Sequence, residues 1–283
     1  MLSMRLLSGI VFFILFFVGL FAPHMQFLLV VLLAFGALMG VHEFIYFSRE
    51  KPPRWLVRLT LVAALAMLVN AYWFHYEYTF IVISLAAVLA LGIITFTDDP
   101  NPTDHASRAI MSLIYVAMPL SLIMAIWHTL SGKPDFDSPQ HYIIFLVLVT
   151  WSSDIGAYFV GRAFGKHKLA PKISPGKTIE GLAGGVAMTL LVAVCMKLFW
   201  NNIDRIFPGP KGWFEVLGLA IAFSLIGPWG DLAESRMKRS TGVKDSGQTF
   251  TGHGGMLDII DSLLFTTIVF YAYLKFFRDF SLF

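Results

Sequence analysis

Long apolar runs alternate along the chain with short segments rich in proline, glycine and charge. A helix that crosses about 30 Å of hydrocarbon needs about 20 mainly apolar residues, and nine runs are candidates for such helices. They are Leu6–Ala22, Phe27–Phe47, Leu56–Phe74, Thr79–Phe96, Ala109–Leu130, Tyr142–Gly161, Gly181–Trp200, Trp213–Gly230 and Leu257–Phe277. The pattern predicts an all-α polytopic membrane protein with about nine transmembrane helices. An alternative with eight spans, in which one short run is re-entrant, is left open.

Composition supports the membrane class and excludes several others. Hydrophobic residues make up 57% of the chain and charged residues 14%, whereas soluble domains average about 45–50% and about 25%. The mean hydropathy is +0.72. The 27 phenylalanines exclude an intrinsically disordered chain, and the single cysteine, Cys195, excludes an intrachain disulfide. A net charge of +3 without a long basic tract argues against nucleic-acid binding.

Basic residues between the apolar runs predict the orientation in the membrane. With nine spans, 15 Lys and Arg residues fall on the side of the N-terminus and six fall on the opposite side. Because cytoplasmic loops are enriched in Lys and Arg, this excess predicts a cytoplasmic N-terminus and a C-terminus on the outside.

The two halves of the chain differ in polar content. Residues 1–130 are interpreted as generic transmembrane helices that form a scaffold and face lipid. Residues 131–283 are interpreted as a catalytic region with cytoplasmic loops 162–180 and 231–257. Glu43, near the cytoplasmic end of the second run, is an exception in the first half, and both a structural and a functional role stay open for it.

The sixth apolar run carries a carboxylate, Asp154, into the membrane. A charged side chain at this depth is unfavourable unless it has a partner. We therefore expect Asp154 to face the interior of the helix cluster. There it either touches the water shell of a metal ion or holds Lys177 or Lys244 in place by an ion pair, and a purely structural pairing is also open.

The loop after this run has features that suit a polyanion. It carries five basic residues and the segment Ser174-Pro175-Gly176-Lys177-Thr178, which we predict to be a turn that opens the next helix. Backbone N–H groups at a helix start and lysine ammonium groups both bind phosphates. The segment is not a P-loop, because Pro171 stands where the first glycine of that motif belongs. The alternative is a loop whose charges only fix the topology.

The last cytoplasmic loop contains carboxylates at helical spacing. Asp231, Glu234 and Lys238 follow i, i+3, i+7 spacing, and Asp258 and Asp261 repeat the i, i+3 spacing where the ninth run begins. Carboxylates from two facing helix ends would form an oxygen-rich site of the kind that Mg²⁺ prefers when it also binds substrate phosphates. We therefore predict Asp231 and Asp258 as metal ligands, with Asp261 beside them.

The motifs in both loops resemble those of the phosphatidate cytidylyltransferase (CDP-diglyceride synthase) family. One match is Ser235-x-x-Lys238-Arg239-x-x-x-x-Lys244-Asp245-Ser246-Gly247, followed by His253-Gly254-Gly255-x-x-Asp258-x-x-Asp261-Ser262. The other extends from Ser153-Asp154 through Gly165-Lys166-His167-Lys168-Leu169 to Ser174-Pro175-Gly176-Lys177-Thr178-x-Glu180-Gly181. The resemblance covers about the last 130 residues. One departure is Ile259, where the family usually has Arg, and its effect on substrate binding stays open.

The resemblance implies transfer of a cytidylyl group from CTP to phosphatidic acid, which gives CDP-diacylglycerol and pyrophosphate. Mg²⁺ is the expected cofactor, and a second cation stays open. The expected partners are CTP, phosphatidic acid and membrane lipids, with no nucleic acid, and a homodimer is left open. The expected location is a bacterial inner (plasma) membrane, with the active site on the cytoplasmic side.

Together the patterns and the resemblance assign a role to each candidate site residue. The catalytic group is Asp154, Lys244, Asp245 and Asp261; the metal ligands are Asp231 and Asp258; and the substrate-binding group is Lys168, Ser174, Lys177, Thr178, Ser235, Lys238, Arg239, His253, Gly254 and Gly255. Two other functions are left open. A CTP-dependent lipid or polyprenol kinase, or a related lipid cytidylyltransferase, would use similar groups, and an ion-coupled transporter would use the aspartates as a cation pathway.

Overall fold

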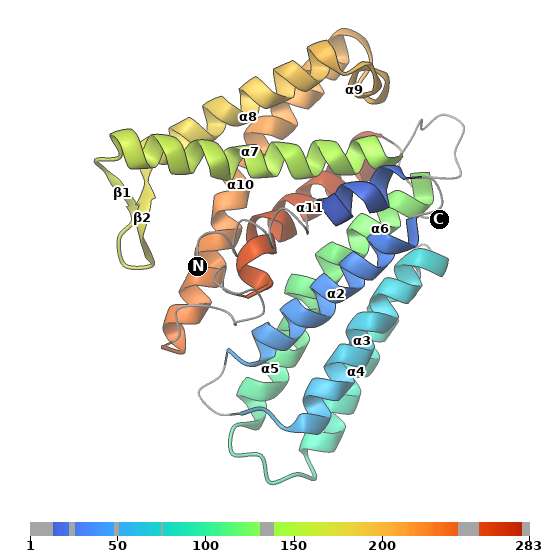
Figure 1. The fold of residues 1–283 in the computed structure, drawn as a ribbon. Helices are drawn as coiled ribbons and strands as arrows, with labels where there is room; N and C mark the ends of the chain where they lie inside the picture. The colour runs from blue at the N-terminus through green and yellow to red at the C-terminus, as the bar shows by residue number, and fades with distance from the viewer. Residues whose placement is uncertain are drawn as a thin grey trace. The chain divides into compact units, whose positions relative to one another are not determined.

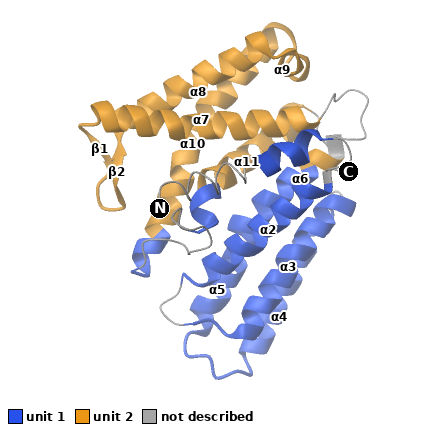
Figure 2. Ribbon diagram, viewed as in Figure 1, with its two compact units in different colours: residues 1–125, 237–260, 282–283 blue, residues 126–236, 261–281 orange. Residues whose placement is uncertain are grey.

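The computed structural model (Figure 1) describes residues 14–22, 26–47, 51–74, 76–130, 139–242 and 255–278. The chain divides into two compact units (Figure 2). The first consists of residues 1–125, 237–260 and 282–283, and the second of residues 126–236 and 261–281.

Within the described residues, seven helices are long and apolar enough to cross a membrane. They are Phe27–Ile45, Arg54–Trp73, Pro102–His128, Pro139–Phe164, Ile179–Phe199, Gly209–Ser240 and Leu257–Phe277. The apolar helix Thr79–Ile94 is shorter. The first predicted run, Leu6–Ala22, lies mostly outside the described residues, and its described part is helical over residues 14–21. The predicted polytopic helical architecture is confirmed, whereas the number of nine spans stays a prediction.

Large apolar side chains cover much of the surface of these helices. Phe80, Phe199 and Phe214 expose 81%, 82% and 79% of their surface. Soluble monomers rarely expose apolar surface on this scale, but hydrocarbon is a favourable neighbour for such side chains. The surface therefore agrees with the membrane class that the composition predicts.

The first unit is built mainly from the N-terminal helices. Its complete elements are α2 (Gln26–Ile45), α3 (Arg54–Trp73), α4 (Thr79–Ile94), α5 (Pro102–Ser112) and the π-helical turn η1 (Leu113–Ala117). It also contains the start of α6 (Met118–Leu130), the last turn of α10 (Gly209–Ser240) and the first turn of α11 (Leu257–Phe277). α2 packs against α3 and α5, and α4 packs against α3 and α5.

Prolines and a buried amide define the helix ends in this unit. Pro53 immediately precedes α3, and Pro102 is the first residue of α5, a position where the missing N–H is not needed. Asn70 Nδ2 donates to Thr79 Oγ1 at 2.7 Å, and Asn70 Oδ1 accepts from Tyr78 N at 3.1 Å. The connection between α3 and α4 is thus fixed by one satisfied side chain.

The second unit begins with a helical hairpin of α7 (Pro139–Phe164) and α8 (Ile179–Phe199), which lie side by side (Figure 1). Glycine permits their close approach. A Cβ atom added to Gly184 would lie 2.3 Å from Val160 Cβ, and one added to Gly156 would lie 2.6 Å from Gly184 O. Small residues let helix backbones pack closely in membranes.

The connection between α7 and α8 differs from the sequence prediction. It contains two antiparallel strands, β1 (Lys168–Ala170) and β2 (Ser174–Thr178), with Lys168 opposite Thr178 and Ala170 opposite Ser174. The segment predicted as a turn is therefore strand β2, and the helix begins one residue later, at Ile179. The described part of the chain is therefore helical with a small β-hairpin rather than purely α.

Charged side chains also pair where the C-terminal end of α8 meets α9 (Asn201–Ile206). The Lys197 side chain is 1% exposed, and its Nζ lies 2.5 Å from Asp204 Oδ1 and also donates to Phe207 O. Arg278, just after α11, pairs with Glu215 of α10 at 2.5 Å. Without such partners, these charged groups would be unfavourable next to apolar side chains.

Candidate functional site

Three helices of the second unit bring several carboxylates into one electrostatic neighbourhood. Asp154 of α7 interacts electrostatically with Asp231 of α10. Asp261 of α11 interacts with both of these and with Glu234 of α10. Asp154 is exposed and accepts a 3.4 Å hydrogen bond from Ser262 Oγ, whereas Asp261 is buried. α10 and α11 approach closely here, since a Cβ on Gly230 would lie 2.5 Å from Asp261 O.

Lys177 of β2 contributes a positive charge to this cluster. Its Nζ lies 2.7 Å from Asp231 Oδ2 and donates to Pro228 O at 3.1 Å. Asp231 Oδ1 also accepts from Ser235 Oγ at 3.3 Å. Lys177 was one of two lysines expected as a partner of Asp154, but it pairs with Asp231 instead and leaves Asp154 only a longer-range attraction. The other lysine, Lys244, lies outside the described residues.

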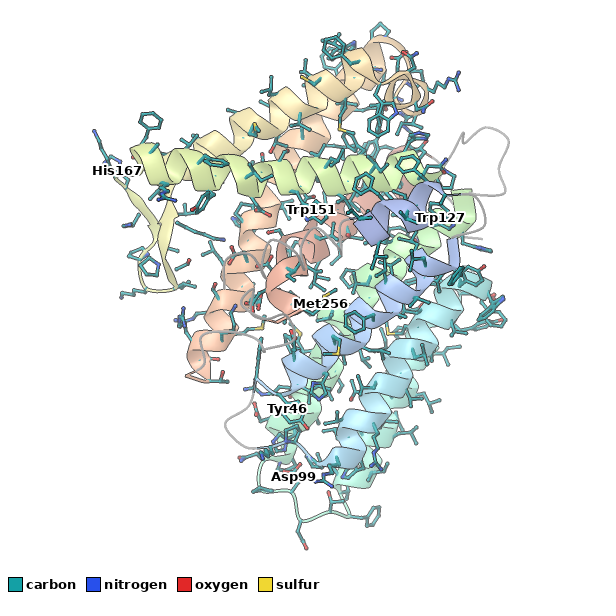
Figure 3. All side chains as sticks on the ribbon, viewed as in Figure 1. Tyr46, Asp99, Trp127, Trp151, His167 and Met256 are labelled. Carbon is teal, nitrogen blue, oxygen red and sulfur yellow. The ribbon has the colours of Figure 1, made fainter. Side chains whose placement is uncertain are left out.

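The hairpin that carries Lys177 is tied to the start of α8. The Glu180 carboxylate accepts from the backbone N–H groups of Lys166 and His167, both at 3.1 Å, and lies 2.5 Å from His167 Nδ1. Figure 3 labels His167 where the hairpin leaves α7. Thr178 Oγ1 accepts from Gly181 N at 3.1 Å and so caps α8. These bonds hold β2 in register with the helix that follows it.

The predicted substrate-binding residues of the hairpin differ in accessibility. Lys168 is exposed, Ser174 and Lys177 are half-buried, and Thr178 is buried. Lys168 is therefore accessible to a ligand, whereas the Lys177 ammonium group is engaged by Asp231 and Pro228 O. Thr178 serves the helix cap, and its predicted contact with phosphate stays a prediction.

In the first unit, Asp258 in the first turn of α11 contacts both the end of α10 and the residues before α11. It forms an ion pair with Lys238 of α10 and accepts from Gly255 N at 2.8 Å. Lys238 is buried, whereas Arg239 beside it is exposed. Lys238, predicted to contact phosphate, thus holds a predicted metal ligand.

The donors in these clusters suit a hard cation. Within the ranges that the structure describes, no three His, Cys, Asp or Glu side chains converge closely enough to hold a metal ion by themselves. The donors of Asp154, Asp231, Asp258 and Asp261 are all carboxylate oxygens. Mg²⁺ uses one or two protein carboxylates and completes its shell with water and substrate phosphate, so this chemistry fits Mg²⁺ bound together with a nucleotide.

Some predicted residues cannot be compared, and others were missed. Lys244, Asp245, His253 and Gly254 lie outside the described residues. Sequence reasoning assigned no role to Glu180 or Ser262, although both stand in the motifs it quoted. The sequence offered one signal for each residue. Ser262 directly follows Asp261, and Glu180 directly follows the first residue of α8.

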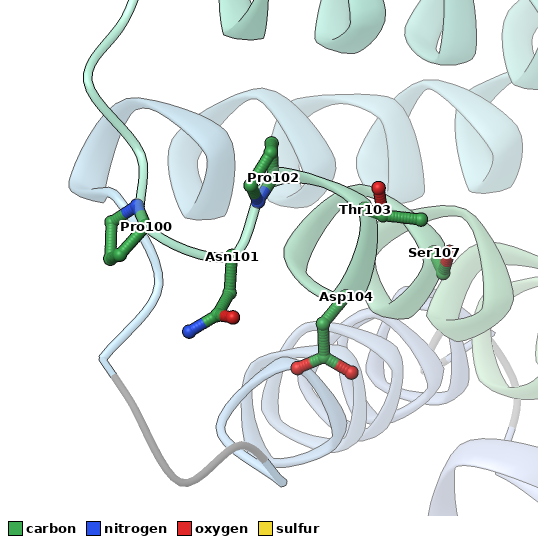
Figure 4. A pocket seen from close by; sticks show the side chains of 6 residues that line it. All are labelled: Pro100, Asn101, Pro102, Thr103, Asp104 and Ser107. Atoms are coloured by element: carbon green, nitrogen blue, oxygen red, sulfur yellow. The ribbon is translucent and has the colours of Figure 1, made fainter.

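A shallow pocket lies elsewhere in the first unit, in the connection that leads into α5 (Figure 4). It is lined by Pro100, Asn101, Pro102, Thr103, Asp104 and Ser107. None of these residues belongs to the predicted site. The candidate functional residues are those of the two polar clusters, one around Lys177 in the second unit and one around Asp258 in the first unit.

Comparison with known proteins identifies the family. The model of the cytidylyltransferase family matches residues 3–277, nearly the whole chain, and this protein belongs to that family. A phosphatidate cytidylyltransferase of Haemophilus influenzae is 33% identical over 98% of this chain and 99% of its own length. Those of Staphylococcus saprophyticus and Staphylococcus aureus are 42% and 46% identical over 56% and 44% of this chain, and 55% and 45% of their own lengths.

Proposed function

We propose that this protein transfers a cytidylyl group from CTP to phosphatidic acid and so forms CDP-diacylglycerol and pyrophosphate. The observation that carries the proposal is the Lys177–Asp231 pair beside Asp154 and Asp261, at the ends of apolar helices. Full-length similarity to a relative named for this reaction supports the choice of substrates.

The reaction joins a soluble nucleotide to a lipid. An oxygen of the phosphatidic acid phosphate attacks the α-phosphorus of CTP, the bond to the β-phosphate breaks, and pyrophosphate leaves with its electron pair. The attacking phosphate is already an anion, so the chain need not supply a strong base. Its work is to position two polyanions and to offset their charge.

Lysines of the two clusters supply positive charge for this work. In this proposal, Lys168 and Lys177 of the hairpin contact CTP phosphates, and Ser174, which lies between them in the sequence, contributes a hydrogen bond. Lys238 fixes Asp258 and lies beside the exposed Arg239. Lys244, Asp245, His253 and Gly254 belong to the same proposed site on the basis of the sequence motif.

Mg²⁺ is the proposed cofactor, with Asp231 and Asp258 as ligands and Asp261 beside them. When bound, the ion would offset charge on the triphosphate and on the pyrophosphate that leaves. Asp231 and Asp258 each have a lysine partner in the described structure. Binding of the ion to these carboxylates would let the lysines contact a phosphate instead, or in addition. A second cation is compatible with the three neighbouring carboxylates of the second unit.

The proposed topology places this chemistry at the cytoplasmic face of a bacterial inner membrane. Nine spans, with the N-terminus in the cytoplasm, put the hairpin and the loop after α10 on the side from which CTP arrives. The excess of Lys and Arg on that side supports the orientation. The lipid phosphate reaches the same level from the headgroup layer.

A detergent assay with CTP labelled in its cytosine ring, phosphatidic acid and Mg²⁺ tests the proposal. We expect label in the chloroform-soluble fraction as CDP-diacylglycerol, with pyrophosphate released in equal amount. A CTP-dependent lipid kinase would instead leave labelled CDP in the aqueous phase and phosphorylate a lipid alcohol. Either that product pattern or no CTP consumption would contradict the proposal.

A further inference from the structure

Glu43 of α2 connects the N-terminal half of the chain to the start of α11. The residue is buried, with 4% of its surface exposed. Its Oε1 accepts from Met256 N at 2.8 Å and its Oε2 accepts from Leu257 N at 2.9 Å. Both contacts lie within the first unit, and they join segments more than two hundred residues apart in the sequence.

The face of α2 that carries Glu43 is shaped to receive this helix end. Gly36, Gly40 and Glu43 follow i, i+4, i+7 spacing and share one face of α2. A Cβ on Gly36 would lie 2.9 Å from Met256 Cε, and one on Gly40 would lie 3.7 Å from Ile260 Cδ1. Figure 3 labels Met256 at the start of α11. Gly36 thus leaves room for the Met256 side chain, whereas Gly40 leaves room for Val116 of η1, whose Cγ1 would lie 2.8 Å from such a Cβ. The Glu43 carboxylate accepts from the first backbone N–H groups of this turn.

The chemistry of this contact favours a carboxylate. The first N–H groups of a helix have no partner within the helix, and the N-terminal end carries a partial positive charge. A buried carboxylate that accepts two such N–H groups satisfies both partners.

The anchored turn also carries a predicted metal ligand. Asp258 follows the two anchored residues directly and accepts from Gly255 N, which precedes them. Its other partner is Lys238. The backbone on both sides of the Glu43 contact therefore sets where the Asp258 carboxylate points.

We propose that Glu43 is a positioning residue for the reaction, which orients Asp258 by holding the first turn of α11. The effect of Glu43 on catalysis rests on the proposed function, whereas the anchoring of α11 by Glu43 does not. The N-terminal half of the chain thus contributes a specific residue to the site, in addition to scaffold.

Hydrogen exchange of the purified full-length protein tests the anchoring without reference to activity. In Glu43→Gln, which keeps the size of the side chain but loses its charge, amides of residues 255–260 should exchange at least about tenfold faster than in wild type. Glu43→Ala should exchange faster still. Glu77→Gln removes an exposed carboxylate from the same unit and should leave these amides unchanged.

Kinetics then test the catalytic consequence. Glu43→Gln should raise the Mg²⁺ concentration for half-maximal activity about tenfold and lower kcat, with little change in the KM for phosphatidic acid. Unchanged exchange at residues 255–260 would overturn the anchoring. Faster exchange with wild-type Mg²⁺ dependence and kcat would overturn the positioning role. If wild type lacks cytidylyltransferase activity, the proposed function fails, while the exchange result still decides the anchoring.

Discussion

Lys177 offsets only part of the negative charge that surrounds it. Asp231 is its ion-pair partner, while Asp154 and Asp261 interact with the same carboxylate from two other helices. Carboxylates gathered in this way repel one another unless cations or protons intervene. Under the proposed function, this lysine would stabilise the unliganded cluster and would turn toward a phosphate when a divalent cation binds.

We predict that Lys177→Ala lowers kcat/KM for CTP by about ten- to a hundredfold, since a lost contact to a charged group is worth about 1.5–3 kcal/mol. Steady-state kinetics at saturating phosphatidic acid measure the effect. Lys172→Ala, an exposed lysine of the same hairpin, is the control and should retain near wild-type kinetics. If Lys177→Ala had the same near wild-type kinetics as Lys172→Ala, the charge of Lys177 would serve only to orient the chain in the membrane.

The two predicted metal ligands give a second prediction at this scale. Asp231→Asn and Asp258→Asn should each abolish turnover, because an amide is a much weaker ligand for Mg²⁺ than a carboxylate. Both variants should still fold and insert into the membrane, but the apparent Tm of Asp258→Asn should fall, because the buried Lys238 loses this ion-pair partner. Asp104→Asn, an exposed carboxylate paired with Arg108, is the matched control. Near-normal activity of either ligand variant at low Mg²⁺ would contradict the assignment.

At the scale of elements, α7 and α8 form a closely packed pair in the second unit. Glycines at the contact let the two helix backbones approach closely. The close packing restricts where the ends of the β-hairpin between them can lie. Glu180 and Thr178 then fix the hairpin to the start of α8. The position of Lys177 therefore depends on helix packing as well as on local strand structure.

Gly184→Ala should destabilise this pair, because its Cβ would lie 2.3 Å from Val160 Cβ. Overpacking of this kind typically lowers stability by about 1–3 kcal/mol, so we expect a lower apparent Tm in detergent. Gly218→Ala in α10 is the control, since a Cβ there meets nothing within 4 Å. That change should be neutral or stabilising, because Ala favours helix over Gly by about 1 kcal/mol. Equal Tm values for the two variants would show that the α7–α8 contact is loose.

The extent of each element was only partly predictable from sequence. Apolar runs locate helices well, but a run ends where polar residues begin. The backbone hydrogen bonds of the helix can continue beyond that point. α10 is the clearest example: the run Trp213–Gly230 became a helix over Gly209–Ser240, with Pro228 inside it. The hairpin was missed because β1 has only three residues, too few to show strand alternation.

At the scale of the whole molecule, the sequence predicted the membrane class, the family and the motifs of the site. It could not predict which polar groups meet, because folding brings distant segments together. Examples are the Lys177–Asp231 ion pair and the hydrogen bond that Met256 N donates to the Glu43 carboxylate. Glu43 shows the consequence most clearly. The sequence left open both a structural and a functional role for this carboxylate, and only the folded chain shows that its hydrogen-bond donors lie at the start of the last helix.

The proposed orientation can be tested on the full chain with single cysteines. Lys172→Cys and Lys211→Cys both replace exposed lysines, one in the hairpin and one near the start of α10, and Cys195→Ser removes the native thiol from the background. If the N-terminus is cytoplasmic, these two positions lie on opposite sides of the membrane. A membrane-impermeant maleimide applied to right-side-out vesicles should label Lys211→Cys at once. It should label Lys172→Cys only after the vesicles are permeabilised. The reverse pattern would invert the topology and place the hairpin where CTP is absent, and labelling of both positions from outside would require an even number of spans between them.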